Sequence, residues 1–226
     1  MPSAGVSAAV HRSPATIGGV DVLVIGAGAF GLWTARWLLR RGASVTLVDQ
    51  YGPGNSLSSS GDESRVTRSA HGADDLYPAW QRRSLEQWRA LDPALFVRTG
   101  VLWLARRDDG FEADALATMG RLGIPAERLD RADRPVAEGR VCQYELTADT
   151  HFIIDRVPEH AGIGAWVVGG GSGHGFKHAP VIGEYLSGLI TGADVSDIRP
   201  PDNRFALRPR TAGIGMRTSG SAPIGS

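Results

Sequence analysis

Short runs of apolar residues in the first part of the chain predict a strand, a helix and a second strand. The β-branched and leucine-rich run over 22–25 leads into a glycine-rich turn, and a similar run covers 45–49. Between the two runs, Trp33, Trp37 and Leu38 share one face at helical spacing. A strand, a turn, a helix and a second strand in this order are typical of a βαβ unit in a parallel sheet.

Further elements follow with less regular spacing. Helices are expected over 74–91 and 111–122, where apolar residues recur at three- and four-residue intervals. Strands are expected over 100–105 and 140–146, and another strand, glycine-rich turn and helix over 165–190. We therefore predict an α/β fold, in which a Rossmann-like, mostly parallel sheet has helices on both faces.

The turn after the first strand carries three glycines in the spacing GxGxxG. Gly26 suits a tight turn, Gly28 lets the backbone approach a pyrophosphate, and Gly31 lets the helix pack closely on the strand. Asp49 ends the second strand, where a carboxylate can accept hydrogen bonds from ribose hydroxyls. A dinucleotide is expected to contact Gly26, Gly28, Ala29, Phe30, Gly31 and Asp49. The fingerprint alone does not choose between NAD and FAD.

Composition narrows the classes of partner. Lys and Arg together number 24, as do Asp and Glu, so the chain has no excess of basic charge for nucleic acid. Cys142 is the only cysteine, which excludes an internal disulfide and a cysteine metal cluster. No apolar run reaches the length of a membrane span, and residues 1–18 have no apolar core for a signal peptide. A cytoplasmic protein with a flexible N-terminal arm is therefore expected.

Several segments together resemble the FAD-dependent amine oxidoreductases of the monomeric sarcosine oxidase and N-methyltryptophan oxidase type. The resemblance rests on residues 22–49, 58–70, 100–104, 142–155 and 158–190. Its most specific part is Cys142-Gln-Tyr144 followed by His151-Phe-Ile-Ile-Asp155, Pro158-Glu-His160 and Gly173-His-Gly-Phe-Lys177. The resemblance implies FAD as cofactor and oxidation of the C–N bond of a secondary (N-methyl) amino acid such as sarcosine. Hydride would pass to the flavin, which oxygen or another acceptor would reoxidise.

The resemblance also implies roles for individual residues. Cys142 falls where the family's cysteine bonds covalently to the flavin, and Tyr144 where a tyrosine lines the substrate cavity. Arg65 falls where an arginine lies against the flavin, while Arg68 and Lys177 match two groups that bind the substrate carboxylate. The catalytic set is Arg65, Arg68, Tyr144 and Lys177; further cofactor contacts are Ser60, Arg65, Cys142, Gly173, His174, Gly175, Phe176 and Lys177.

Physical arguments support this set, although plainer interpretations exist. A carboxylate buried beside a flavin needs cationic, hydrogen-bonding partners to offset its desolvation, and Lys177 is the only lysine in the chain. The alternatives are that Arg65 and Arg68 form a solvated helix face, and that Cys142 is a small buried apolar side chain. His174 is expected to serve the backbone turn and not to act as an acid or base.

The chain departs from the family pattern between about residues 130 and 139, where the family has roughly 150 further residues of substrate-binding domain. It also has no second lysine to assist the reaction with oxygen. We expect a flexible arm (1–18), an FAD-binding domain (19–70 and 140–198), a truncated substrate-domain remnant and linker (71–139) and a disordered tail (199–226). The alternatives are a catalytically impaired or inactive flavin-binding remnant, and a plain NAD-binding domain. A monomer and an unknown oligomer both remain open.

Overall fold

Two small β-sheets lie in the part of the chain that the computed structural model describes, residues 9–12, 20–61, 64–105, 107–129 and 146–209. The strands are β1 (Ala9–Arg12), β2 (Asp21–Ile25), β3 (Ser44–Asp49), β4 (Ile153–Arg156) and β5 (Trp166–Gly169). The larger sheet has the order β1-β3-β2, in which β2 runs parallel and β1 antiparallel to β3. β4 and β5 form a separate antiparallel pair.

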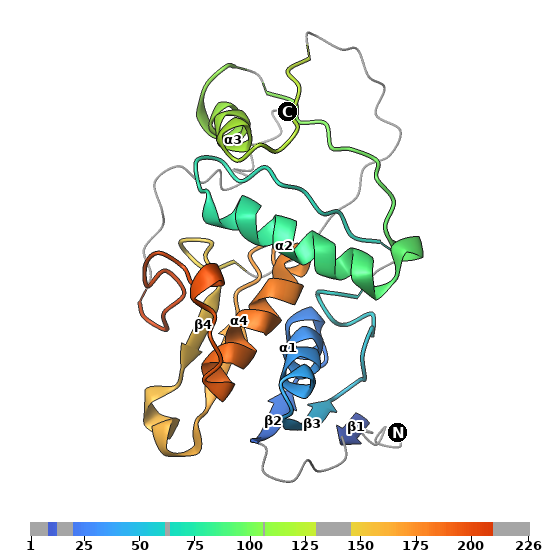
Figure 1. Cartoon of the computed structure of the whole chain (residues 1–226), viewed down its shortest axis with the longest axis vertical. Coiled ribbons are helices and arrows are strands. Elements are labelled where there is room, and N and C mark those ends of the chain that lie inside the picture. Colours follow the sequence, from blue (N-terminus) through green and yellow to red (C-terminus); the bar gives the residue numbers. More distant parts are fainter. Residues whose placement is uncertain (1–8, 13–19, 62–63, 106, 130–145, 210–226) are drawn as a thin grey trace, which may run out of the picture.

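The helices extend away from the larger sheet, with α1 beside it and α3 at the opposite end of the molecule (Figure 1). They are α1 (Ala29–Arg40), α2 (Leu76–Leu91), α3 (Gly110–Arg121) and α4 (Ala179–Thr191), with short 3-10 helices η1 (Pro93–Leu95), η2 (Pro158–Ile163), η3 (Phe176–His178) and η4 (Ser196–Ile198). Helix α1 lies next to β2 and β3, α4 packs beside α1, and α2 crosses over both. No helix of the described residues is long and apolar enough to span a bilayer.

The β2–α1–β3 unit confirms the α/β class and the Rossmann-like parallel pair. Leu38 on α1 is fully buried against Val45 of β3, and Val22 and Val24 of β2 pack against the same cluster. A Cβ atom at Gly31 would lie 1.9 Å from the carbonyl oxygen of Gly26, so only glycine allows this approach of helix to strand. The predicted close packing of α1 on the strand is therefore present.

The other face of β2 is open. Leu23 and Ile25, which alternate with the buried-side valines, are 58% and 80% exposed. No helix of the described residues covers that face at β2. Helices on this side, which the sequence led us to expect, are therefore not found in the described ranges.

Helix α4 approaches α1 so closely that backbone meets backbone. A Cβ atom at Gly183 would lie 2.5 Å from the carbonyl carbon of Trp33 and 2.7 Å from the amide nitrogen of Thr34. Arg41, just after α1, donates to the Ser187 hydroxyl at 3.0 Å and to the carbonyl of Glu184 at 3.4 Å. The two helices are thus joined by both a steric fit and hydrogen bonds.

Helix α2 is tied to α4 by a buried carboxylate. Glu184 accepts two hydrogen bonds from the Arg83 guanidinium, at 2.6 and 2.8 Å, and a third from Gln87 at 2.9 Å. Gln87 in turn accepts from the indole N–H of Trp37 on α1, so these polar contacts link three helices. The main apolar core beneath them consists of Tyr77, Trp80, Phe152, Ile154, Val181, Ile182, Leu186, Val195, Ile198 and Phe205.

Two sequence predictions need correction. Residues 100–105 do not form a strand: Val101, Leu102 and Leu104 are 48%, 51% and 76% exposed, and no described strand lies beside them to complete a ladder. The N-terminal arm, for which no strand was expected, contains β1, which pairs antiparallel with β3. The predicted linker over 130–139, strand 140–146 up to residue 145 and tail beyond 209 lie outside the described residues.

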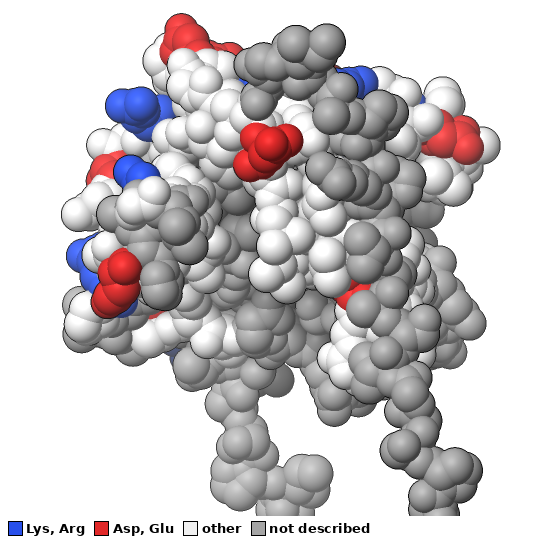
Figure 2. All heavy atoms as spheres, turned by 90° about the horizontal axis from the view of Figure 1, so that it is seen from below, with Lys and Arg blue, Asp and Glu red and all other residues white. Residues whose placement is uncertain are grey.

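Charged side chains are dispersed over the end of the molecule at which the larger sheet lies (Figure 2). On this face, basic and acidic groups of the described residues stand among uncharged ones. This distribution agrees with the balanced composition of the chain. The described residues on view therefore offer no broad basic surface of the kind that binds nucleic acid.

We expect Gly183→Ala to destabilise the fold by about 1–3 kcal/mol, the usual cost of overpacking, because the added methyl group meets backbone that has no room to shift. Gly120→Ala in α3 is the matched control, since nothing lies within 4 Å of a Cβ atom there. Removing a helical glycine at that site should be neutral or stabilising by up to about 1 kcal/mol. Chemical denaturation measures both; equal effects of the two substitutions would contradict this packing.

Candidate functional site

The glycine turn after β2 holds the carboxylate that ends β3. Gly26 adopts a positive φ of 104°, and its N–H donates to the carbonyl of Val48 at 2.8 Å. The Asp49 carboxylate accepts hydrogen bonds from the backbone N–H of Ala27 at 2.7 Å and of Tyr51 at 2.8 Å. The N–H of Ala27 contributes most to lowering the pKa of Asp49, followed by that of Tyr51. The predicted ribose carboxylate is therefore held in its ionised form beside the turn.

The N-terminus of α1 faces the polar loop that follows β3. Gly28 is the N-cap residue and supplies no side chain to cap the helix. The Ala29 N–H instead donates to the Ser60 hydroxyl at 3.2 Å, and the hydroxyls of Ser58 and Ser60 lie 2.8 Å apart. The structure thus brings Ser60 to the glycine turn, although the two are far apart in the sequence.

The second glycine-rich turn lies directly against the first. A Cβ atom at Gly175 would lie 2.6 Å from the ring of Phe30, the residue just before the third glycine of the GxGxxG turn. Phe30 also packs edge-on against Phe152, with ring centroids 6.0 Å apart. Gly173 has a positive φ of 70° and His174 follows it, so this turn leads directly into η3 and α4. Two turns that the sequence predicted separately therefore meet at one place.

Arg65 joins the same region. Its guanidinium lies 5.6 Å from the centroid of the Phe176 ring and donates to the carbonyl oxygens of Gly61 at 2.5 Å and Ser59 at 3.3 Å. Phe176 is stacked on Trp88 of α2 at 4.9 Å. Arg65 is thus held by its own loop and by an aromatic ring, which argues against a solvated helix face.

Arg68 and Lys177 form the most unusual part of the site because both are cationic and withdrawn from water. Lys177 is only 3% exposed, and burial, together with the charge of Arg68, keeps its pKa well below the usual range. Burial also lowers the pKa of Arg68, whose guanidinium donates to the carbonyl of Ala70 and lies 4.8 Å from the centroid of the Trp103 ring. Among the described residues, no carboxylate pairs with either cation. This arrangement favours an anionic ligand.

Two histidines that the sequence reading did not single out also lie here. His71 and His178 surround the same space as His174, and their rings lie 5.2–5.7 Å from one another. Their sequence positions carried a signal: His71 follows Arg68 by three residues, and His178 is next to Lys177. Nε2 of His174 donates a hydrogen bond to the carbonyl oxygen of Thr150 at 3.1 Å, which ties the second glycine turn to the residues before β4.

Cys142 and Tyr144 lie outside the described residues. Their predicted contacts with the flavin and the substrate therefore stay predictions. The structure brings together the remaining predicted residues in two groups. The first, around the GxGxxG turn, contains Gly26, Gly28, Ala29, Phe30, Gly31, Asp49 and Ser60; the second contains Arg65, Arg68, Gly173, His174, Gly175, Phe176 and Lys177.

Residues 21–143 match the family model described as FAD dependent oxidoreductase (DAO). The chain is 44% identical over 73 residues to monomeric sarcosine oxidase from Bacillus sp. strain B-0618, which is 32% of this chain and 18% of that protein. It is 28% identical over 114 residues to N-methyl-L-tryptophan oxidase from Salmonella dublin, 49% of this chain and 31% of the relative. Peroxisomal sarcosine oxidase from Mus musculus is 32% identical over 117 residues, 50% of this chain and 30% of the relative. The matched residues thus span under a third of each of these relatives.

We expect Asp49→Asn to lower the free energy of unfolding by an amount that depends on pH. Because the pKa of Asp49 is lowered in the folded protein, its stabilising effect is complete above the ordinary aspartate pKa of about 3.9 and is lost as the pH falls through the lower folded value. The stability gap between wild type and variant should therefore shrink in acid. Denaturation at stepped pH measures it, with Asp109→Asn, whose side chain makes no capping hydrogen bond, as control. If the stability difference between wild type and Asp49→Asn stays constant into strong acid, the pKa of Asp49 is not lowered in the folded protein.

Proposed function

The chain belongs to the FAD dependent oxidoreductase family, and from this membership we propose that it binds FAD and oxidises the C–N bond of a secondary amino acid such as sarcosine. The observation that carries the proposal is the pair of basic side chains, the half-buried Arg68 and the buried Lys177, beside two glycine turns that meet at Phe30 and Gly175. The proposed reaction requires a site for FAD and, in contact with it, a site for the carboxylate of the amino acid.

The residues around the first turn fit the adenosine diphosphate part of FAD. Gly28, the N-cap residue of α1, has no capping side chain, and Ser60 accepts from the N–H of Ala29 alone. The other N–H groups of the first turn and the partial positive charge there suit a diphosphate. Asp49 is ionised and ends β3, where it would accept hydrogen bonds from a ribose. In the second group, the turn from Gly173 to Gly175 would direct the N–H groups that follow it toward the flavin, as the family resemblance implies. When bound, FAD would supply the two-electron acceptor.

The chain's own contribution to catalysis is to bind and orient the substrate. Arg68 can present two parallel N–H donors to a carboxylate, and Lys177 adds a compact positive charge. An amino-acid carboxylate placed between them would offset the cost of burying both cations, and this ion pairing would raise the lowered pKa of Lys177. We extend the proposal to a covalent bond between the flavin and Cys142, and to Tyr144 as a wall of the substrate cavity, as the resemblance implies.

A catalytically impaired flavin-binding protein is the second candidate. The residue content of the given chain favours it, because the chain has no lysine besides Lys177 to assist the reaction of reduced flavin with oxygen. Flavin absorbance in the purified protein separates both candidates from a plain NAD-binding domain. Bleaching of that absorbance by an N-methyl amino acid then separates the oxidoreductase from the impaired protein.

We expect Gly28→Val to abolish retention of flavin, because an isopropyl group at this position blocks the approach of a diphosphate to the backbone of the turn. Gly120→Val is the matched control, since it adds the same side chain to an open position on α3. The ratio of flavin to protein absorbance in each purified variant is the measurement. If Gly28→Val retains as much flavin as the wild type, the GxGxxG turn does not bind the diphosphate of FAD.

Lys177→Met should weaken the binding of N-methyl amino acids by roughly 10- to 150-fold, the equivalent of losing one charge-assisted hydrogen bond of about 1.5–3 kcal/mol. The measurement is the perturbation of the flavin spectrum as a function of sarcosine concentration. Arg82→Met, an exposed position on α2 that donates to the carbonyl of Leu122, is the control and should bind like wild type. Equal affinities in Lys177→Met and wild type would show that the carboxylate binds elsewhere.

A further inference from the structure

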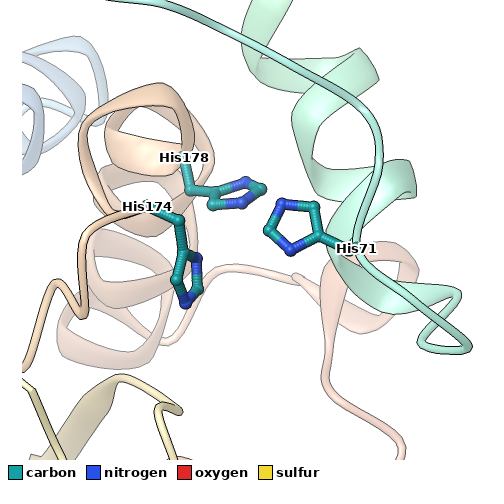
Figure 3. Close-up of side chains that lie close together, drawn as sticks. All are labelled: His71, His174 and His178. Carbon is teal, nitrogen blue, oxygen red and sulfur yellow. The ribbon is translucent and has the colours of Figure 1, made fainter. Parts of the chain in front are cut away.

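Three histidines from separate segments converge in the interior of the protein (Figure 3). His71 precedes α2, His174 lies in the second glycine turn, and His178 ends η3. One ring nitrogen from each can be chosen so that all three lie within 4.8 Å of one another. The rings of His71 and His178 face each other in the close-up, with His174 below them.

The nitrogens of this cluster lack partners. His71 Nε2, His174 Nδ1 and both ring nitrogens of His178 are buried, with no hydrogen-bond partner in the part of the chain that the structure describes. His178 is fully buried, and solvent reaches neither of its nitrogens. An unsatisfied buried polar atom costs about 1–3 kcal/mol, so a ligand that pairs with several of these nitrogens at once would stabilise the fold.

The hydrogen bond of His174 determines which nitrogen is free to ligate. Its Nε2 lies 3.1 Å from the carbonyl oxygen of Thr150, which can only accept, so Nε2 carries the proton and Nδ1 the lone pair. Nδ1 is also the nitrogen that has no partner. A ring N–H donated to a backbone carbonyl, with the other nitrogen turned inward, is the arrangement that orients metal-binding histidines.

Two basic side chains lie near the cluster. The charges of Lys177 and Arg68 act on His71, His174 and His178 and oppose a bare cation, so an anionic fourth ligand is expected at the ion.

We propose that His71, His174 and His178 bind a divalent transition-metal ion, Zn²⁺ by preference, and leave a fourth position for hydroxide or another small anion. Three imidazoles and one open position are a common ligand set for this ion. With Zn–N bonds of about 2.0–2.1 Å, tetrahedral ligand atoms lie about 3.3 Å apart. The present separations of up to 4.8 Å therefore require a modest inward rotation of the rings. His174 belongs to the second glycine turn, so the cluster borders the candidate flavin site, but the metal proposal does not depend on the proposed oxidation.

The first test is isothermal titration of the full chain with ZnCl₂, without added flavin. Wild type should bind one ion that is lost in His178→Gln and in His71→Gln. His151→Gln is the control, because His151 lies nearby but pairs through Nδ1 with the hydroxyl of Tyr77 at 2.6 Å and is not part of the cluster. Circular dichroism confirms that each variant is folded. Unchanged affinity in both cluster variants would overturn the site and assign any bound zinc to other groups.

X-ray absorption of wild-type protein with one equivalent of Zn²⁺ provides a second test that needs no variant. The expected spectrum has three imidazole ligands and one lighter oxygen donor at bond lengths near 2 Å. One imidazole or none would overturn the proposal, as would failure of the wild type to bind zinc. Because neither experiment involves flavin, the outcome is independent of whether the chain oxidises an amine.

Discussion

The fold of the site depends on the contact between α1 and α4, where the backbone of Trp33 lies against Gly183. Each of these helices begins at a glycine-rich turn or directly after one, so bringing the helices together also brings the turns together. The contact of Gly175 with Phe30 at their N-terminal ends follows from this geometry. Any side chain at Gly183 would separate the helices and, with them, the two halves of the site. The close packing at Gly183 therefore determines whether the two glycine turns of the candidate site can meet.

The sequence predicted those parts of the fold that depend on local pattern. The β2–α1–β3 unit carries its own signal in periodicity and in glycines whose roles are steric, such as Gly31. Residues 100–105 are equally apolar, but a strand also needs a neighbouring strand for its backbone hydrogen bonds. None of the described strands lies alongside them, and the local sequence gives no sign of this. The pairing of β1 with β3 was not predicted, because the residues of the N-terminal arm show no alternation of apolar and polar positions that would indicate an edge strand.

The candidate site was predictable where a motif marks it and not where only packing does. Arg68 and Lys177 stood out by family resemblance and, for Lys177, by being the only lysine. Nothing in the spacing of His71 and His178 showed that α2 and α4 would bring them within reach of His174. The result is a group of two cations and three imidazoles, of which Lys177 and His178 are buried, with no described carboxylate paired to either cation. Burying unpaired positive charge is unfavourable, so this group suits an anionic ligand.

The hydrogen bond between the Ala29 N–H and the Ser60 hydroxyl affects the energetics of anion binding at α1. A phosphate that takes this N–H has to displace a serine, so the contact exchanges one hydrogen bond for another. The net gain then comes from the charge on the phosphate, because a charge-assisted bond is about twice as strong as the neutral one it replaces. Uncharged molecules gain nothing from the exchange. Through Ser60, this helix N-terminus therefore favours charged ligands over neutral ones.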